Sequence, residues 1–419
     1  MNIFFSGIGG VGIGPLAEIA HDAGFTVIGS DQSESLQTAR LRERGIAINI
    51  GQDGSFLEAE HAATPINWFV YTASLPHNHP ELVRARQLGM RTSKRDELLA
   101  YILNEKKLKL IAVAGTHGKT TTSGMMTWAF KQLGIPISYS VGSTLSFGPN
   151  GKYDPRSEYF IYECDEFDRN FLHFSPHLSL ITSLSYDHPD TYPTENDYKT
   201  AFAQFLTQSD MTILWQKDAD FLDNPSISGW CLQQNEEQEF ALAGNHNRRN
   251  ATLVAKAMEY LLNNQRTSDI QIALNDFPGT DRRFERLADN LYSDYAHHPT
   301  EIAATLELAL ELSKDVVVVY QPHQNRRQYQ VRQLYSHCFD GAKHVFWLPT
   351  YLTREDPGQE ILPPEELYSV ASQKENISAA QLDNDLWRAI TEARQKNNLV
   401  VAMGAGTIDK WLREHLSTE

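Results

Sequence analysis

Short hydrophobic runs recur along the chain, and helix-length segments separate them. The runs are bounded by Gly, Pro or Asp and read NIFFSG, FTVIGSD, WFVYTAS, KLIAVAGT, YFIYECDE, LSLITS, MTILW, DVVVVYQP, HVFWLP and LVVAMGAG. Strands that alternate with helices form parallel sheets joined by crossover helices. The pattern therefore predicts an α/β fold.

Three segments of the chain each begin with such a strand-and-helix unit. The first covers residues 1–104. The second covers residues 105–283 and begins near LKLIAVAGTHGKT, and the third covers residues 284–419, from the end of the loop DFPGTDRRFER at residues 276–286. A domain commonly has about 150 residues, so a chain of 419 residues agrees with this division. We therefore expect three domains.

The charge balance argues against some partners. The chain has 37 basic and 53 acidic residues, which leaves a formal net charge of −16. Such a chain repels a polyanion, so we expect no nucleic acid partner. A phosphate-bearing ligand must instead be bound by a local site.

No segment has the form of an export signal or a membrane helix. MNIFFSGIGG has no basic stretch before its apolar run, and runs such as VVVVY are strand-sized, whereas a membrane helix needs about 20 residues. Cys164, Cys231 and Cys338 lack CxxC spacing, which is typical of a reducing compartment and of small packing residues. We expect a cytoplasmic protein with no membrane partner.

A glycine-rich motif follows the strand NIFFS. Gly7, Gly9, Gly10 and Gly12 form GxGxxG, which allows a tight turn and lets backbone amides approach a pyrophosphate at a helix start. Asp31 ends the next strand, where its carboxylate can reach a ribose hydroxyl. Glycine is also needed wherever a strand turns sharply into a helix. The position favours a nucleotide-type ligand over this structural alternative.

A second glycine-rich motif lies between the strand LKLIAVA and a helix. In such a loop, backbone amides surround phosphates, a lysine reaches the β- and γ-phosphates, and a hydroxyl binds magnesium. Val113 takes the first glycine position of the strict GxxxxGKT pattern. The motif nevertheless predicts a phosphate site, formed by Gly115, Thr116, His117, Gly118, Lys119, Thr120 and Thr121.

Two acidic motifs follow further strands: Glu163–Asp168 after YFIY, and Tyr186–Asp190 after LSLITS. Acidic residues at strand ends lie at the ligand-binding edge of a doubly wound sheet, so Glu163 could hold a magnesium ion. We assign a metal role to Glu163 and His188 only, and helix capping explains some of the other acids. Histidine is an unusual ligand for magnesium, which prefers oxygen.

Further polar clusters follow strands or lie on short loops in the second half of the chain, where binding sites are commonly built. They are Gly244–Asn250, Arg282–Glu285, Asp294–Glu301, Gln321–Arg327 and Met403–Thr407. From composition alone, His297 and His298 read as a hydrogen-bonded pair within a turn.

Taken in order, these motifs resemble those of the Mur ligase family, the ATP-dependent amide-forming enzymes of peptidoglycan precursor synthesis. The matching motifs span nearly the whole chain and read GIGGVG, GTHGKTTT, ExDExD, DHxDTY, NHNxxNA, RRFE, DYxHHPTEI, QPH and GAG. They are most similar to the branch that joins L-alanine to UDP-N-acetylmuramate. The resemblance implies a Rossmann-like N-terminal domain for the UDP-sugar, a P-loop central ATPase domain and a Rossmann-like C-terminal domain for the amino substrate.

The resemblance also implies roles for individual residues. Those implied to bind the UDP-sugar are Gly7, Gly9, Gly10, Gly12, Asp31 and Thr72. Those implied to bind ATP are the loop Gly115–Thr121 with His246, Asn250, Arg283 and Asp294. Thr120, Glu163 and His188 would hold Mg²⁺, and Tyr295, His297 and Arg327 would surround L-alanine or another small amino acid. The residues implied to act in catalysis are Lys119, Glu163, His188, Arg283, His297 and Arg327.

One departure concerns the amino substrate. The alanine-adding branch usually reads QPHR-Y-T-R where this chain reads QPHQNRR, so Gln324 replaces the first arginine and Arg327 keeps the second place. Either Arg326 substitutes for the lost arginine, or the amino substrate is not free alanine. GAGTI also replaces the common GAGDI.

Three alternative activities remain. A recycling ligase that attaches a tripeptide to UDP-N-acetylmuramate has a similar acidic run, but its later motifs fit less well than QPH and GAG. The second alternative is a nucleotide-binding regulator without ligase activity. The chain keeps the intact set Lys119, Thr120, Glu163 and His188, which argues against this alternative. An NAD-dependent dehydrogenase built on GIGGVG leaves the second glycine loop unexplained. The sequence does not indicate an oligomeric state.

Overall fold

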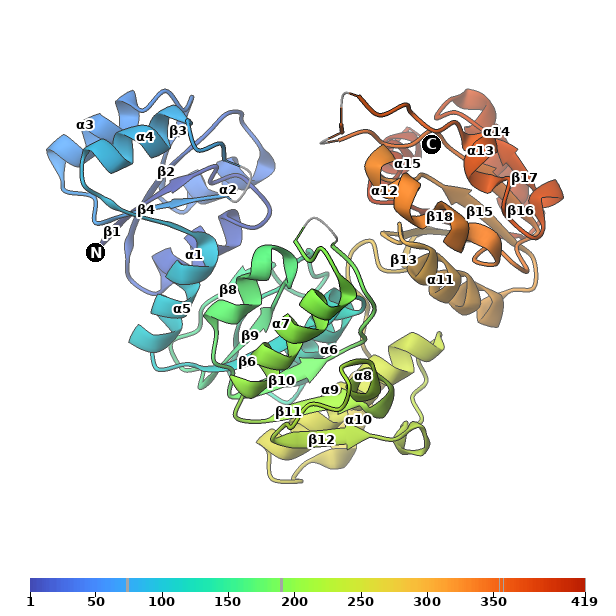
Figure 1. Ribbon diagram of the computed structural model, residues 1–419, viewed down its shortest axis with the longest axis horizontal. Helices are drawn as coiled ribbons and strands as arrows, with labels where there is room; N and C mark the ends of the chain where they lie inside the picture. Colours follow the sequence, from blue (N-terminus) through green and yellow to red (C-terminus); the bar gives the residue numbers. More distant parts are fainter. Residues whose placement is uncertain (73–74, 189–190, 354, 357, 419) are drawn as a thin grey trace. The chain divides into compact units, whose positions relative to one another are not determined.

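The computed structural model describes residues 1–72, 75–188, 191–353, 355–356 and 358–418 (Figure 1). These residues form three sheets with helices on their faces, which confirms the α/β prediction. All ten hydrophobic runs contain strands. Pro189 and Asp190 of the acidic motif Tyr186–Asp190 lie outside the described residues.

Five parallel strands form the first sheet, drawn in blue in Figure 1, in the order β3-β2-β1-β4-β5. They are β1 (Asn2–Ser6), β2 (Thr26–Asp31), β3 (Ala47–Ile50), β4 (Trp68–Tyr71) and β5 (Arg91–Lys94). The helices between and after them are α1 (Gly14–Asp22), α2 (Leu36–Glu43), α3 (Ser55–Ala63), α4 (Pro80–Gln87) and α5 (Arg95–Glu105).

Alternate residues of β1 face opposite sides of this sheet. Ile3 and Phe5 belong to a core that includes residues of α1 and α5, whereas Phe4 packs with Leu57 of α3 and Leu82 of α4. A strand that is covered on both faces must be apolar at successive positions. This explains why NIFFS reads as a continuous hydrophobic run.

The second sheet has seven described strands in the order β12-β11-β10-β6-β9-β7-β8. They are β6 (Lys109–Ala114), β7 (Ser138–Ser140), β8 (Gly151–Lys152), β9 (Tyr159–Glu163), β10 (Leu178–Ile181), β11 (Thr212–Trp215) and β12 (Gly229–Leu232). The helices of this region are α6 (Lys119–Gln132), α7 (Glu195–Thr207), α8 (Gln216–Phe221), α9 (Asn245–Leu261) and α10 (Thr267–Asn275), with 3₁₀ segments η1 (Phe167–His173) and η2 (Gln234–Glu236).

The third sheet has six described strands in the order β13-β14-β18-β15-β16-β17. They are β13 (Glu285–Ala288), β14 (Leu291–Asp294), β15 (Val316–Tyr320), β16 (His344–Trp347), β17 (Ile377–Ala379) and β18 (Leu399–Met403). Its helices are α11 (Pro299–Leu312), α12 (Asn325–Val331), α13 (Pro364–Tyr368), α14 (Asn384–Gln395) and α15 (Ile408–Leu416), with 3₁₀ segments η3 (Arg332–Ser336) and η4 (Lys374–Asn376).

The expectation of parallel sheets is wrong at two edges. β7 pairs with β8, and β13 pairs with β14, in antiparallel fashion. In both cases the connection is too short to hold the crossover helix that a parallel pair requires. The other strand pairs of the described sheets are parallel.

The chain divides into two compact units. Residues 1–237 and 250–277 form the first unit, which contains the first two sheets, and residues 238–249 and 278–419 form the second. Within the first unit, α1 packs closely on β8, since a methyl group added to Gly151 would lie 2.7 Å from Pro15 Cβ. The predicted boundaries at residues 104 and 283 stay predictions.

No helix in the described ranges is both long and apolar enough to cross a membrane. The predicted cytoplasmic location stays a prediction. Cys164 and Cys338 are buried free thiols, and Cys231 is a half-buried one. The expected packing role is confirmed for the first two.

Candidate active site

The second glycine loop has a backbone that glycine makes possible. Gly115 has φ +131° and Gly118, which precedes α6, has φ +88°, conformations that other residues rarely adopt. A methyl group on Gly115 would also lie 2.5 Å from Thr182 Oγ1 and 2.8 Å from the Ser183 carbonyl. The loop therefore turns tightly over the end of β10.

Hydrogen bonds fix this loop to the segment after β10. The Thr116 amide donates to the Ser183 carbonyl at 2.7 Å, and Thr182 Oγ1 donates to the His117 carbonyl at 2.5 Å. The Thr116 hydroxyl bonds to the Tyr198 hydroxyl at 2.7 Å. These contacts tie the loop to the end of β10 and to α7.

Lys119, the first residue of α6, points back into the loop. Its Nζ donates to the Gly115 carbonyl at 2.6 Å and to Glu166 Oε2 at 2.7 Å. Burial by itself lowers the pKa of Lys119, but the negative charges of Glu166, Asp165 and Glu163 outweigh it and raise the pKa above its usual value. Lys119 therefore carries a positive charge at neutral pH.

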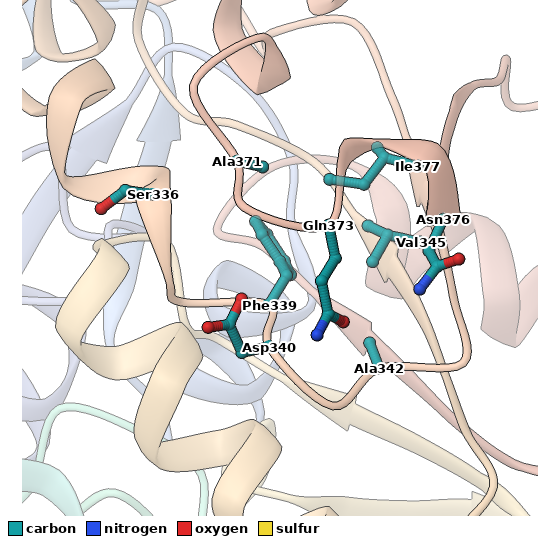
Figure 2. A pocket seen from close by; sticks show the side chains of 9 residues that line it. All are labelled: Ser336, Phe339, Asp340, Ala342, Val345, Ala371, Gln373, Asn376 and Ile377. Carbon is teal, nitrogen blue, oxygen red and sulfur yellow. The ribbon is translucent and has the colours of Figure 1, made fainter.

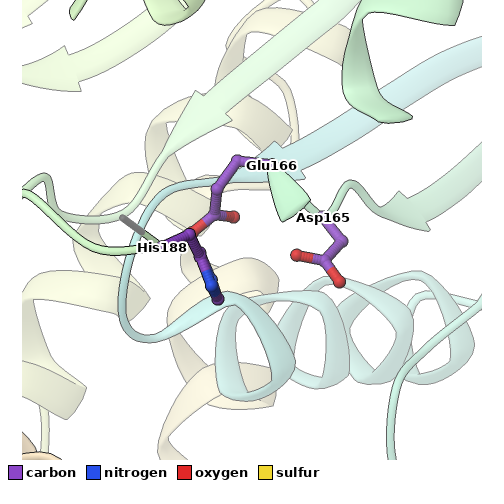
Figure 3. Close-up of side chains that lie close together, drawn as sticks. All are labelled: Asp165, Glu166 and His188. Atoms are coloured by element: carbon purple, nitrogen blue, oxygen red, sulfur yellow. The ribbon is translucent and has the colours of Figure 1, made fainter. Parts of the chain in front are cut away.

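Glu166 is fully buried, and the sequence analysis did not assign it to the site. Burial raises the pKa of Glu166, and the ion pair with Lys119 opposes that rise. Its Oε1 has no hydrogen-bond partner among the described residues and lies 3.8 Å from His188 Nε2. Figure 3 shows Asp165, Glu166 and His188 gathered around one small space, with one ligand atom of each within 4.8 Å of the others.

Glu163 lies at the end of β9 and contacts the glycine loop directly. Its Oε1 accepts a hydrogen bond from Thr120 Oγ1 at 2.8 Å, and its Oε2 accepts one from the Gly142 amide at 2.8 Å. The structure thus brings Thr120 to Glu163, while it brings His188 to Asp165 and Glu166. The signal for the two additional acids was already in the run ECDEFD.

This donor set fits a magnesium ion. Mg²⁺ binds through one or two carboxylates, further oxygens and water, and Thr120, Glu163, Asp165 and Glu166 supply such oxygens. The buried Oε1 of Glu166 without a partner is the kind of atom that a cation would satisfy. The metal assignment of Thr120, Glu163 and His188 stays a prediction.

Two further predicted ATP residues belong to different units. Asn250 on α9 is buried, and a methyl group on Gly118 would lie 3.1 Å from its Nδ2, so Asn250 borders the phosphate loop. His246 belongs to the second unit, where burial lowers its pKa to about 4. There Arg248 and the Gly244 amide donate to Glu311 beside it.

The first glycine loop follows β1. Gly7 has φ +78°, and a methyl group on it would lie 3.5 Å from Thr72 Cγ2. The Gly10 amide bonds to the Gly7 carbonyl at 3.0 Å, which closes the turn. The Gly9 amide donates to Asp31 Oδ2 at 2.8 Å, so Asp31 supports the loop itself. The predicted UDP-sugar residues therefore lie together.

A cavity of about 240 Å³ borders the first glycine loop and the acidic end of β9 within the first unit. Its lining includes Gly12 of the first loop and Glu163, which contacts Thr120 of the second. The other lining residues are Val11, Leu16, Ile19, Arg95, Leu99, Ser140, Val141, Gly142, Tyr162 and Asp165. The cavity therefore runs from the first loop to the carboxylate that contacts Thr120.

In the second unit, the predicted residue Asp294 supports a turn. Its Oδ2 accepts from the Phe284 amide at 2.7 Å, and its Oδ1 accepts from the Ala296 amide at 2.8 Å. Burial raises the pKa of Asp294, and Arg283 opposes the rise. The assigned ribose contact stays a prediction.

Tyr295, His297 and Arg283 lie close together in the second unit. The Arg283 guanidinium lies 5.3 Å from the centre of the Tyr295 ring, whose centre lies 5.5 Å from that of His297. Burial lowers the pKa of His297 to about 4, although Glu301 opposes the shift, so the ring is neutral at pH 7. Arg327 contributes positive charge to the same environment.

The loop that contains Gln324 carries the departure from the alanine-adding pattern. Gln324 has φ +61° and precedes α12, and its amide donates to the Tyr351 carbonyl at 2.9 Å. The side chain of Arg326 is exposed, and its amide donates to Glu355 Oε2 at 3.2 Å. Arg327 is half-buried, and its charge acts on His297.

A further pocket in the second unit carries no residue from these motifs. It is bounded by the segment after η3 and by β16 and β17 (Figure 2), and its side chains include Phe339, Val345 and Ile377. Its lining also includes the polar residues Ser336, Asp340, Gln373 and Asn376, and it has no room for a water molecule, so it is a packing feature.

Family models and known proteins resemble this chain over nearly its whole length. Models of the Mur ligase family match residues 2–107 (catalytic domain), 113–274 (middle domain) and 282–406 (glutamate ligase domain). A UDP-N-acetylmuramate–L-alanine ligase of Thermosynechococcus vestitus is 30% identical over 97% of this chain and 93% of its own length.

Two solved structures have the same fold over the whole chain. A UDP-N-acetylmuramate–alanine ligase of Thermotoga maritima covers 100% of both chains with a TM-score of 0.75 and 24% identity. A murein peptide ligase of Psychrobacter arcticus covers 100% of this chain and 98% of its own, with a TM-score of 0.65 and 22% identity. With three matched domains and a relative aligned over nearly its full length, the chain belongs to the Mur ligase family.

Proposed function

We propose that this protein is an ATP-dependent ligase that joins L-alanine to the lactyl carboxylate of UDP-N-acetylmuramate, a step of peptidoglycan precursor synthesis. The observation that carries the proposal is a cavity lined by Gly12 of the first glycine loop and by Glu163, which accepts a hydrogen bond from Thr120 of the second loop. A phosphate donor at the second loop and a UDP-sugar at the first could meet there. Relatives named as UDP-N-acetylmuramate–L-alanine ligases add support.

A carboxylate does not react with an amine at neutral pH, so ATP must activate it. A carboxylate oxygen attacks the γ-phosphorus, the bond to ADP breaks, and an acyl phosphate forms. The neutral amine then attacks the acyl carbon, inorganic phosphate leaves, and the amine loses a proton. The positive charge of Lys119 stabilises the transferring phosphoryl group, an effect commonly worth several kcal/mol.

Mg²⁺, for which Thr120, Glu163 and His188 are the proposed ligands, would neutralise phosphate charge when bound. Glu166 holds the Lys119 ammonium beside the loop. Tyr295, His297 and Arg327 are proposed to bind the amino acid. The half-buried, neutral His297 ring can accept a hydrogen bond from an ammonium group.

Phosphate release tests this function. The protein should release phosphate when Mg²⁺, ATP, UDP-N-acetylmuramate and L-alanine are all present, and omission of any substrate should stop the release. Malachite-green detection measures it. Phosphate release that does not depend on the UDP-sugar would contradict the ligase assignment.

The murein tripeptide is the second candidate for the amino substrate, because Gln324 replaces an arginine of the alanine-adding pattern. A kinetic panel of the twenty amino acids and the tripeptide separates the two candidates. A strong preference for the tripeptide would assign the protein to the recycling reaction. A preference for L-alanine would support the first proposal.

A further inference from the structure

Acidic groups dominate the charge of the cavity beside the first glycine loop. Glu163 and Asp165 are lining residues, and Arg95 is the only positively charged residue among those described in the lining. A UDP-sugar brings at least two further negative charges on its diphosphate. Without Arg95, this cavity would repel the proposed substrate.

Arg95, the first residue of α5, lies against the first glycine loop. A methyl group on Gly12 would be only 2.5 Å from Arg95 Nη1, so the absence of a side chain at this position lets the guanidinium approach the loop. Gly12 is the third glycine of GxGxxG and does not have a positive φ. Space for Arg95 is therefore a second reason for glycine at this position.

The guanidinium has capacity for a ligand. Its ion pair with Asp96 runs through Nε at 3.5 Å, and no hydrogen bond joins Nη1 or Nη2 to a described residue. Asp96 is itself engaged, because its Oδ1 accepts a hydrogen bond from Tyr162 at 2.6 Å. The Arg95 side chain is 32% exposed, so solvent or a ligand can reach it.

The backbone of the loop offers fewer donors than its sequence suggests. The Gly9 amide already donates to Asp31, and the Gly10 amide already donates to the Gly7 carbonyl. The Asp31 carboxylate also adds a negative charge close to the loop. A side-chain cation would therefore add to the backbone donors that remain at the Gly12 end of the loop.

We propose that Arg95 binds the diphosphate of the UDP-sugar at the Gly12 end of the first glycine loop. The inference rests on the proposed function, because that function supplies the ligand. A guanidinium donates two parallel hydrogen bonds to phosphate oxygens, which lysine cannot do. The apolar walls formed by Leu16, Ile19 and Leu99 lower the local dielectric and strengthen this contact.

Calorimetric titration of Arg95→Met with two sugar nucleotides tests the proposal. UDP-N-acetylmuramate and UDP-N-acetylglucosamine share the diphosphate, but only the first has a lactyl carboxylate. We expect both dissociation constants to rise by about ten- to a hundredfold. Arg95→Lys should recover part of the loss, and Arg95→Met should make binding less sensitive to salt. A residue that acts only on the fold would leave the salt dependence unchanged.

Arg91→Met is the matched control. Arg91 is exposed and stacks on Trp68, with its guanidinium 3.4 Å from the ring centre, so its loss should leave sugar-nucleotide affinity unchanged. Binding of a non-hydrolysable ATP analogue should remain normal in both variants. Unchanged affinity of Arg95→Met for both sugar nucleotides would overturn the proposal and leave the ligase function intact.

Two other outcomes also contradict it. If only UDP-N-acetylmuramate binds more weakly, Arg95 recognises the lactyl carboxylate and not the diphosphate. If the wild-type protein binds neither sugar nucleotide, the proposed function fails together with the inference.

Discussion

The two glycine-rich loops of the first unit resemble each other in sequence but differ in the source of their positive charge. The loop after β6 contains Lys119 within its own motif, and that lysine returns to the Gly115 carbonyl. The loop Gly7–Gly12 contains no basic residue, and Arg95 reaches it from the start of α5. A motif can therefore reveal the cation of one anion site and miss that of the other.

Lys119 and Arg95 also differ in how closely each pairs with a negative charge. The Lys119 side chain is 14% exposed and pairs at 2.7 Å with Glu166, which is fully buried. Arg95 is 32% exposed and has a longer contact to Asp96. We infer that the second loop is held in a fixed arrangement, whereas the first keeps its cation available for a ligand.

Removal of the lysine should have the largest effect. Lys119→Ala should lower the rate of phosphate release by at least about a thousandfold, because a preorganised charge on the transferring group is lost. Binding of UDP-N-acetylmuramate should remain, since the proposed UDP-sugar residues belong to the other loop. Phosphate assays and calorimetry measure the two quantities.

Lys131→Met is the control for this variant. Lys131 lies on the same helix, α6, but its side chain is exposed. Its loss should leave turnover unchanged. Loss of UDP-sugar affinity in a folded Lys119→Ala protein would show that the two loops do not act separately.

The next effect concerns the partner of Lys119. Glu166→Gln should lower the stability of the first unit by on the order of 3 kcal/mol, because removal of one partner leaves a buried charge unpaired. Differential scanning calorimetry without nucleotide should show a lower transition temperature. Glu97→Gln, at an exposed position of α5, is the control. Equal transition temperatures would mean that water or another group compensates Lys119.

Strands with continuous apolar sequences were predictable from the sequence, and those at sheet edges were not. β15 (VVVVY) is covered on both faces and reads as an unbroken hydrophobic run. β5 reads RTSK and β8 has only two residues, so their place in a sheet depends on neighbouring strands. Hydrophobic periodicity carries little information for such strands.

The residues of the candidate site also differ in whether the sequence could predict them. Gly115, Lys119 and Thr120 were found because one short motif contains them. The contact of Arg95 with Gly12 joins residues far apart in the chain, and only the packing of α5 beside the loop brings them together. Glu166 was visible in the acidic run, but nothing in its sequence position distinguishes a partner of Lys119 from a helix cap.

The amino-acid site tests whether a missing cation can be restored. In Gln324→Arg, we expect the apparent KM for L-alanine to fall by about tenfold, since arginine adds a charged contact to the substrate carboxylate. Steady-state kinetics at saturating ATP and UDP-sugar measure this change. Gln330→Arg, at an exposed position of α12, should leave KM unchanged. No change in Gln324→Arg would instead favour a substrate other than free alanine.

The smallest expected effect tests how Gly12 and Arg95 act together. In Gly12→Ala, the new methyl group would displace the end of the flexible Arg95 side chain and would create no backbone strain. The fold should therefore persist, while the dissociation constant for the UDP-sugar rises by about three- to fivefold, or about 1 kcal/mol. Gly14→Ala is the control, because its methyl group would meet the Gln37 side chain, 2.7 Å away, instead of Arg95.

In an Arg95→Met background, Gly12→Ala should have almost no further effect, since the group that it displaces is gone. Additive losses in this double-mutant cycle would mean that Gly12 contributes through its own backbone, and the two loops would then differ less than their side chains indicate.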